Sequence, residues 1–154
     1  MASLIGSYSL NFGLFFSFFI IFFSINNLKN AENLDKKIIS FTFLQFFFVI
    51  ISFVGLIISF INSDFSNETV FNHSHTTKPL FYKISGTWGN HEGSLLLWVI
   101  ILTLFSFLFL VVNKNHPKTF RLFTLIIQNI LILGFLFFIF FNSNPFSALS
   151  PVPE

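Results

Sequence analysis

Four long apolar runs constrain this chain more than any other feature of its sequence. They cover about residues 4–25, 38–61, 95–112 and 122–141, and none contains Asp, Glu, His, Lys or Arg. A helix that rises about 1.5 Å per residue needs about 20 residues to cross a hydrocarbon core about 30 Å thick. In lipid a backbone must satisfy its own hydrogen bonds, so each run is predicted to be helical despite its many Phe and Ile residues. The sequence therefore predicts an all-α, polytopic membrane protein with four transmembrane helices in a single membrane domain, residues 1–154.

Composition supports this class and excludes others. Hydrophobic residues make up 54% of the chain and charged residues only 9%, whereas average soluble domains contain about 25% charged residues. The lipid bilayer is therefore the expected partner, and nucleic acid is not. Because the chain has no cysteine, it supplies no disulfide and no thiolate metal ligand. The first run lacks the basic n-region and the small-residue cleavage site of a signal peptide, so we expect it to remain as a helix.

The basic residues between the runs predict an orientation. Six of the eight Lys and Arg residues lie in the first and third loops, and these six are Lys29, Lys36, Lys37, Lys114, Lys118 and Arg121. The longer second loop, residues 62–93, holds only Lys78 and Lys83. Short loops rich in Lys and Arg stay on the cytoplasmic or matrix side of a membrane. Both termini and the long second loop are therefore predicted on the outer, periplasmic or intermembrane side.

Small residues recur on one side of each of the first two runs. They are Gly6, Gly13, Ser17 and Ser24 in the first run and Ser52, Gly55 and Ser59 in the second. Small side chains let membrane helices approach closely, so we interpret these positions as helix-packing residues and not as a transport pathway. The adjacent amides Gln128 and Asn129 of the fourth run are expected to face another helix. The lack of ionisable residues inside the runs argues against a proton relay or an ion pump.

A glycine-rich polar stretch precedes the third run and reads GTWGNHEGS over residues 86–94. One interpretation is structural: Ser94 is the N-cap of the third helix, and the Glu92 carboxylate lies beside the positive end of the helix dipole. A cap does not require His91, nor glycines that leave the backbone free to turn. The alternative is a docking surface made of Trp88, Gly89, His91, Glu92, Gly93 and Ser94. These residues alone leave both interpretations open.

Two histidines of the second loop, His73 and His75, are spaced so that both imidazoles can approach one metal ion. A zinc site needs three or four protein ligands, and nothing nearby supplies the others. We therefore predict no metal site and no catalytic residue in this chain.

Two segments carry a resemblance to a known family. Residues 79–99 closely resemble the segment before the third helix of CcmF-type proteins, the haem lyase component of cytochrome c maturation system I, and read PLFYKISGTWGNHEGSLLLWV. Residues 134–147 are similar to the end of that family's fourth helix and read GFLFFIFFNSNPFS. The family also has outward termini, so the resemblance extends over essentially the whole chain.

The resemblance implies that this chain is the amino-terminal membrane scaffold of a haem lyase that attaches haem covalently to apocytochrome c. CcmF-type proteins are several times longer, and their Trp-rich WWD segment and haem-ligating histidines lie beyond the matched part. No haem ligand carries over, so haem is expected to be bound by the missing remainder, and this segment alone is not expected to be catalytic. The implied partners are the carboxy-terminal CcmF portion, CcmH-type and CcmE-type maturation proteins, and apocytochrome c.

Several alternatives stay open at this point. The chain is either a fragment or the amino-terminal piece of a split protein. Its membrane is the bacterial inner (cytoplasmic) membrane or, alternatively, the mitochondrial inner membrane. A function of a different class is a small non-catalytic membrane subunit of a respiratory or transporter complex, against which the missing intramembrane charges argue.

Overall fold

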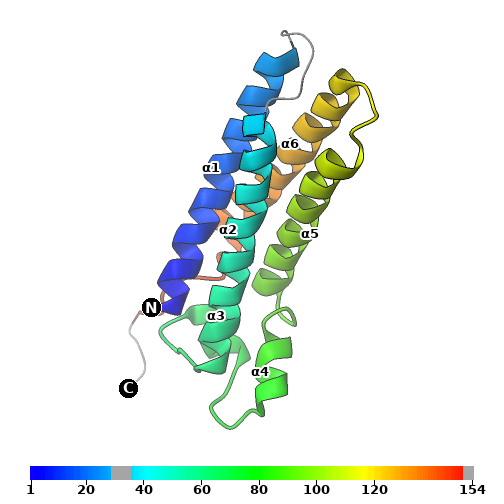
Figure 1. Ribbon diagram of the computed structural model, residues 1–154. Coiled ribbons are helices and arrows are strands. Elements are labelled where there is room, and N and C mark those ends of the chain that lie inside the picture. Colours follow the sequence, from blue (N-terminus) through cyan, green and yellow to red (C-terminus); the bar gives the residue numbers. More distant parts are fainter. Residues whose placement is uncertain (29–35, 151–154) are drawn as a thin grey trace.

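The computed structural model describes residues 1–28 and 36–150, and within these ranges the regular elements are all helices (Figure 1). The long helices are α1 (Ala2–Leu28), α2 (Lys36–Ile61), α5 (His91–Val112) and α6 (Lys118–Asn142), and the short ones are α3 (Glu68–His73) and α4 (Leu80–Gly86). The four long helices are apolar and long enough to cross a membrane, which confirms the predicted number and class. They extend beyond the predicted runs by up to four residues at an end. Lys29, which counts toward the predicted orientation, lies outside the described residues.

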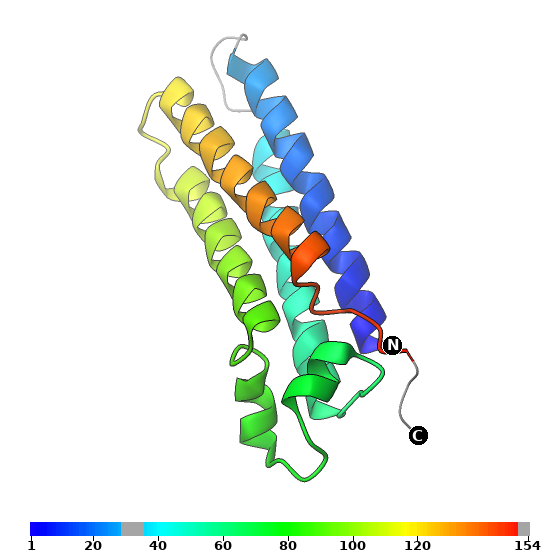
Figure 2. The ribbon, with the colours of Figure 1, turned by 180° about the vertical axis from the view of Figure 1, so that it is seen from behind.

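The long helices form a bundle in which α1 packs between α2 and α6, and α5 packs against α2 and α6 from the other side (Figures 1 and 2). The backbones of α1 and α2 approach closely where the two helices cross. There, a Cβ atom on Gly55 would lie 3.0 Å from the carbonyl oxygen of Ala2 and 3.1 Å from the Cα atom of Gly6. The buried residues of the two helices include Gly6, Gly13, Ser17, Ser24, Ser52, Gly55 and Ser59. Glycine at this crossing lets the two backbones come together without an intervening side chain.

A buried polar residue separates two apolar clusters along each long helix. The first cluster includes Leu10, Val49, Val99 and Ile132, and the second includes Ile20, Ile38, Leu110 and Leu125. The fully buried polar residues between them include Ser17, Gln45, Ser106 and Asn129. We refer to these four residues as the polar layer.

The polar layer joins helices in pairs. The side-chain amide of Gln45 donates to Ser17 Oγ, which links α2 to α1. The amide of Asn129 donates to Ser106 Oγ at 3.4 Å, and that of Gln128 donates to the Leu102 carbonyl oxygen at 3.2 Å. Both bonds run from α6 to α5, which confirms that the two amides face another helix. Such bonds contribute about 0.6 kcal/mol each on average in a membrane, enough to favour one register of the helices over its neighbours.

The second loop is ordered by contacts with both ends of the chain. Asn67 caps α3 by accepting a hydrogen bond from the Val70 N–H at 3.2 Å. Its amide donates to Ser3 Oγ at 3.2 Å and to the Pro145 carbonyl oxygen at 2.9 Å. Phe146 is buried over Gly6, where a Cβ atom would lie 2.4 Å from the phenyl ring. The start of α1, the α3 segment and residues 143–149 therefore meet at one end of the bundle (Figure 2).

Arg121 is placed differently from the prediction, which assigned it to the third loop. Because α6 begins at Lys118, Arg121 lies in its first turn with only 7% of its surface exposed, and its guanidinium donates to the Leu110 carbonyl oxygen. That carbonyl belongs to the last turn of α5, whose carbonyl groups have no partner within their own helix. The prediction was wrong because hydropathy marks the apolar length of a helix, whereas the helix itself continues into polar residues until a cap ends it.

Candidate docking surface at the start of helix α5

The turn between α4 and α5 is built around the buried side chain of Asn90. Its Oδ1 atom accepts a hydrogen bond from the Gly93 N–H at 2.7 Å, so Asn90 is the N-cap of α5. Its amide nitrogen donates to the carbonyl oxygens of Gly86 at 2.8 Å and Thr87 at 3.2 Å. One side chain therefore ties the end of α4 to the first turn of α5.

Ser94 is not the N-cap, which corrects the structural interpretation of this stretch. The helix begins at His91, and Ser94 Oγ donates back to the His91 carbonyl oxygen at 3.0 Å. The prediction placed the cap next to the apolar run, although Asn is as good an N-cap as Ser and four polar or small residues can form a first turn. Glu92 does lie in that first turn, beside the positive end of the helix dipole.

Gly93 is required by lack of space and not by backbone freedom. A Cβ atom at Gly93 would lie 1.6 Å from the carbonyl oxygen of Thr87 and 2.8 Å from its carbonyl carbon. In the described ranges, no glycine has a positive φ, so the expectation that these glycines free the backbone to turn does not hold. The first turn of α5 packs directly on the Thr87 carbonyl group.

The predicted docking residues separate by exposure. Trp88, Gly89 and His91 are exposed, Glu92 and Ser94 are half-buried, and Gly93 is buried. We call Trp88, Gly89 and His91 the turn surface. Sequence reasoning missed Thr87 and Asn90, both buried, which hold this surface in place. The N-cap preference of Asn was the signal that could have identified Asn90.

Exposed apolar side chains continue from the turn surface onto α4. Leu80, Phe81 and Tyr82 are exposed, Phe81 to 76%, and α4 has no buried residue. Lys83 of the same helix is half-buried, and its Nζ atom donates to Ser63 Oγ at 2.6 Å. Exposed aromatic side chains such as Phe81 and Tyr82 are typical of a membrane–water interface or of a protein-binding surface.

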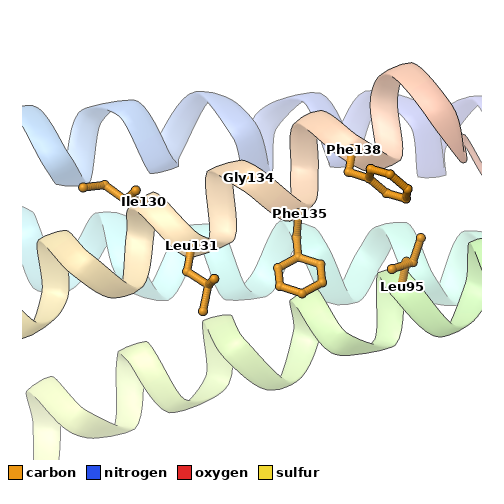
Figure 3. Close-up of a pocket in the computed structure, with 6 residues that line it drawn as sticks. All are labelled: Leu95, Ile130, Leu131, Gly134, Phe135 and Phe138. Atoms are coloured by element: carbon orange, nitrogen blue, oxygen red, sulfur yellow. The ribbon is translucent and has the colours of Figure 1, made fainter.

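His91 also borders an apolar groove between α5 and α6. Its ring meets the Phe138 ring edge to face, with centroids 6.2 Å apart and planes at 86°. Phe138 lines a groove of about 510 Å³ together with Leu95, Ile130, Leu131, Gly134 and Phe135 (Figure 3). Apart from the neighbouring backbone of α6 itself, no atom lies within 4 Å of the position that a Cβ atom of Gly134 would occupy, so the groove is open there.

The remaining histidines lie apart from this surface. His73 Nδ1 lies 3.1 Å from the Thr69 carbonyl oxygen, and His75 is exposed. His116 lies in the loop between α5 and α6, at the opposite end of the bundle (Figure 1). Within residues 1–28 and 36–150, no group of three or more His, Asp or Glu side chains is placed to hold a metal ion.

Comparisons with known proteins give relatives of one kind. The chain is 34% identical to the cytochrome c-type biogenesis protein CcmF of Haemophilus influenzae over 155 residues, which cover 98% of this chain and 24% of that protein. It is 44% identical to the cytochrome c-type biogenesis protein CycK of Rhizobium meliloti over 108 residues, which cover 70% of this chain and 16% of the relative. It is 38% identical to CcmF of Escherichia coli over 111 residues, or 72% of this chain. No protein-family model matches the chain.

The fold has a counterpart among solved structures. A structure described as the cytochrome c haem lyase CcmF matches 98% of this chain with a TM-score of 0.85 and 21% sequence identity. At this identity the match establishes a shared fold. The chain spans only 16% to 26% of the length of these relatives.

Proposed function

Because this chain is homologous to the N-terminal part of the CcmF, CycK and Ccl1 cytochrome c-type biogenesis proteins, we propose that it is the amino-terminal membrane scaffold of a haem lyase. In this role it contributes to the covalent attachment of haem to apocytochrome c. The observation that carries the proposal is the match to a CcmF protein over 98% of this chain, in sequence and independently in fold.

The described residues do not fit a haem at membrane depth. All four histidines of the chain lie in loops, in the short helix α3 or at the very start of α5, and none lies within the apolar length of a long helix. A haem held between helices needs an axial ligand such as His on one of them. We therefore assign haem binding to the remainder of the family fold and propose no catalytic role for this segment alone.

The bundle suits a scaffold role because its helices are fixed to one another by short-range contacts. α1 and α2 are in close contact where they cross at Gly6 and Gly55, and the polar layer sets the register of the helices. Arg121 links the start of α6 to the end of α5 by a hydrogen bond. The groove beside Gly134 offers an apolar face on which a helix of the carboxy-terminal CcmF portion packs.

The turn surface is our candidate docking site for the partners of this reaction, namely CcmE-type and CcmH-type maturation proteins or apocytochrome c. Trp88 presents a large ring that stacks on planar or apolar groups, and His91 offers a hydrogen-bonding nitrogen beside it. Asn90 holds the turn that carries both, so little conformational entropy is lost when a partner binds.

We infer the orientation from the distribution of Lys residues. Lys36, Lys37, Lys114 and Lys118 lie at one end of the bundle, and of the described Lys residues only Lys78 and Lys83 lie at the other. We place the end that carries the turn surface on the outer side. The chain is a multi-pass membrane protein related to bacterial CcmF, and we assign it to the bacterial inner membrane, with the mitochondrial inner membrane as the alternative.

The test compares cytochrome c yield with the amount of membrane-inserted protein in a full-length or reconstituted split enzyme. His91→Ala and Trp88→Ala should lower the yield about tenfold or more at unchanged protein level, since truncation of a central interface residue costs about 2 kcal/mol or more. Ser94→Ala is the matched control and should leave the yield unchanged. If the cytochrome c yield changes only in proportion to the protein level in all three variants, residues 86–94 have a purely structural role.

Co-purification separates this function from that of a respiratory or transporter subunit. The tagged chain should retain the carboxy-terminal portion and the maturation proteins, and it should carry no stoichiometric haem absorbance when purified alone. A histidine-dependent Soret band from the isolated chain, or retention of respiratory subunits without maturation proteins, contradicts the proposal.

A further inference from the structure

A small polar cavity lies at the same end of the bundle as the turn surface, where α3, the first turn of α5 and the end of α6 meet. Its volume is about 150 Å³, and its lining includes the carboxylates of Glu68 and Glu92. Asn72, Asn142 and Asn144 line it as well, with three hydroxyl-bearing residues, and none of its lining residues is Lys, Arg or His. Two acidic groups therefore share a polar space without a basic side chain among them.

Some polar groups of this cavity have no hydrogen-bond partner among the described residues, whereas Asn144 Oδ1 accepts a hydrogen bond from the Phe146 N–H and Ser147 Oγ donates to the Asn144 carbonyl oxygen. The Oε2 atom of Glu92 is buried and has no hydrogen-bond partner. Thr69 and Ser143 also line the cavity and are only 4% and 7% exposed, and neither hydroxyl forms a hydrogen bond with another described residue. A buried carboxylate oxygen without a partner destabilises the fold, so a ligand that neutralises it is favoured.

We propose that this cavity binds a divalent cation of the calcium type. The side chains offer carboxylate and hydroxyl oxygens, and Asn72 and Asn142 add amide oxygens if each turns its carbonyl inward, whereas Asn144 Oδ1 already accepts from the Phe146 N–H. Hard cations such as Ca²⁺ prefer oxygen ligands of these kinds. Calcium takes about 6–8 oxygen ligands in flexible geometry, and the two carboxylates would be completed by neutral oxygens and by water. At about 30 Å³ per water molecule, the space admits an ion that keeps part of its hydration shell.

The end of α6 adds to the attraction for a cation. Asn142 is the last residue of that helix, where unpaired carbonyl groups give a partial negative charge. The ion would join α3, α5 and α6, which meet here from distant parts of the sequence. The site lies apart from the His73 and His75 pair, and it is an alternative to our prediction of no metal site. It does not depend on the proposed role in haem attachment.

Calcium binding is measured on the whole chain in nanodiscs of phosphatidylcholine, with CaCl₂ as the probe and NaCl of equal ionic strength as the reference. We expect one Ca²⁺ per chain with an apparent Kd of about 0.1–1 mM, the range of weak extracellular sites, and a thermal midpoint that rises with CaCl₂. Glu92→Gln and Glu68→Gln should each weaken binding about tenfold or more. Asp64→Asn is the matched control because Asp64 is acidic, lies in the same loop and does not line the cavity.

Asn72→Asp keeps the proposal testable if the glutamate variants do not fold. It adds a third carboxylate to the lining and should tighten Ca²⁺ binding about tenfold, because affinity rises with the number of charged ligands. The proposal is overturned if equilibrium dialysis finds no stoichiometric Ca²⁺ on the wild-type chain. It is also overturned if Glu92→Gln and Asp64→Asn bind Ca²⁺ equally. Neither readout involves cytochrome c, so failure here leaves the haem lyase proposal untouched.

Discussion

Replacement of Asn90 by Ala should destabilise the first turn of α5, because this one side chain makes three hydrogen bonds in the turn. Loss of the N-cap bond to the Gly93 N–H costs about 1 kcal/mol. Loss of the bonds to the Gly86 and Thr87 carbonyl oxygens costs about 1 kcal/mol each. Asn90 is 6% exposed, so water does not replace these partners freely. We expect Asn90→Ala to lower the free energy of unfolding by about 2–4 kcal/mol.

Two further variants separate the parts of this effect. Asn90→Ser keeps an oxygen that can cap the helix but removes the amide donors, so it should cost about 1–2 kcal/mol. Ser94→Ala removes only a bond from the Ser94 hydroxyl to the His91 carbonyl oxygen, and it should cost less than about 0.5 kcal/mol.

The assay is reversible unfolding in mixed micelles, followed by far-UV circular dichroism, together with hydrogen exchange of the Gly93 and Ser94 amides. In Asn90→Ala the two amides should exchange faster than in the wild type, since the Gly93 N–H loses its acceptor. If Ser94→Ala destabilises the protein as much as Asn90→Ala, the cap lies at Ser94 and our account of the turn is wrong.

Three other predictions test the bundle and its orientation. Gly55→Ala should lower the free energy of unfolding by about 1–3 kcal/mol, because the new Cβ atom would crowd backbone atoms of α1. In the same unfolding assay, Gly134→Ala should leave this free energy unchanged or raise it by up to about 1 kcal/mol, because the space around Gly134 is open. Arg121→Met should cost about 2 kcal/mol, measured in the same way, because the Leu110 carbonyl oxygen loses a charged donor. The chain has no native cysteine, so single cysteines can be labelled selectively. A cysteine at Asn72 should react with an impermeant thiol reagent added from the outside, and one at Asn115 should not. Labelling at Asn115 alone would mean that the orientation is the reverse of the one predicted.

Sequence reasoning correctly predicted features that depend on composition over a local length. A run of about 20 apolar residues has to span a bilayer as a helix wherever it occurs in a chain, so the four long helices follow from hydropathy alone. That the amides of Gln128 and Asn129 face a neighbouring helix was predictable too, because a buried amide in lipid needs a polar partner.

The ends of the helices could not be read from hydropathy. The first turns that contain Glu92 and Arg121 are polar, and a polar turn looks the same in sequence whether it is helix or loop. Whether Asn90 or Ser94 caps α5 depends on where the Thr87 carbonyl group lies, since Gly93 packs directly against it. The turn surface is therefore exposed for a reason that becomes visible only when α4 and α5 are placed in space.

The sequence by itself determined that this chain is a four-helix membrane protein, since the thickness of the bilayer imposes a local rule on every run of residues. Only the tertiary structure decided that Glu68, Glu92 and Asn142 line one cavity, and that Asn67 binds to Pro145. These groups are separated by 24 to 78 positions in the chain. No local pattern encodes such contacts, because they depend on how the helices cross and on where the segment after α6 folds back.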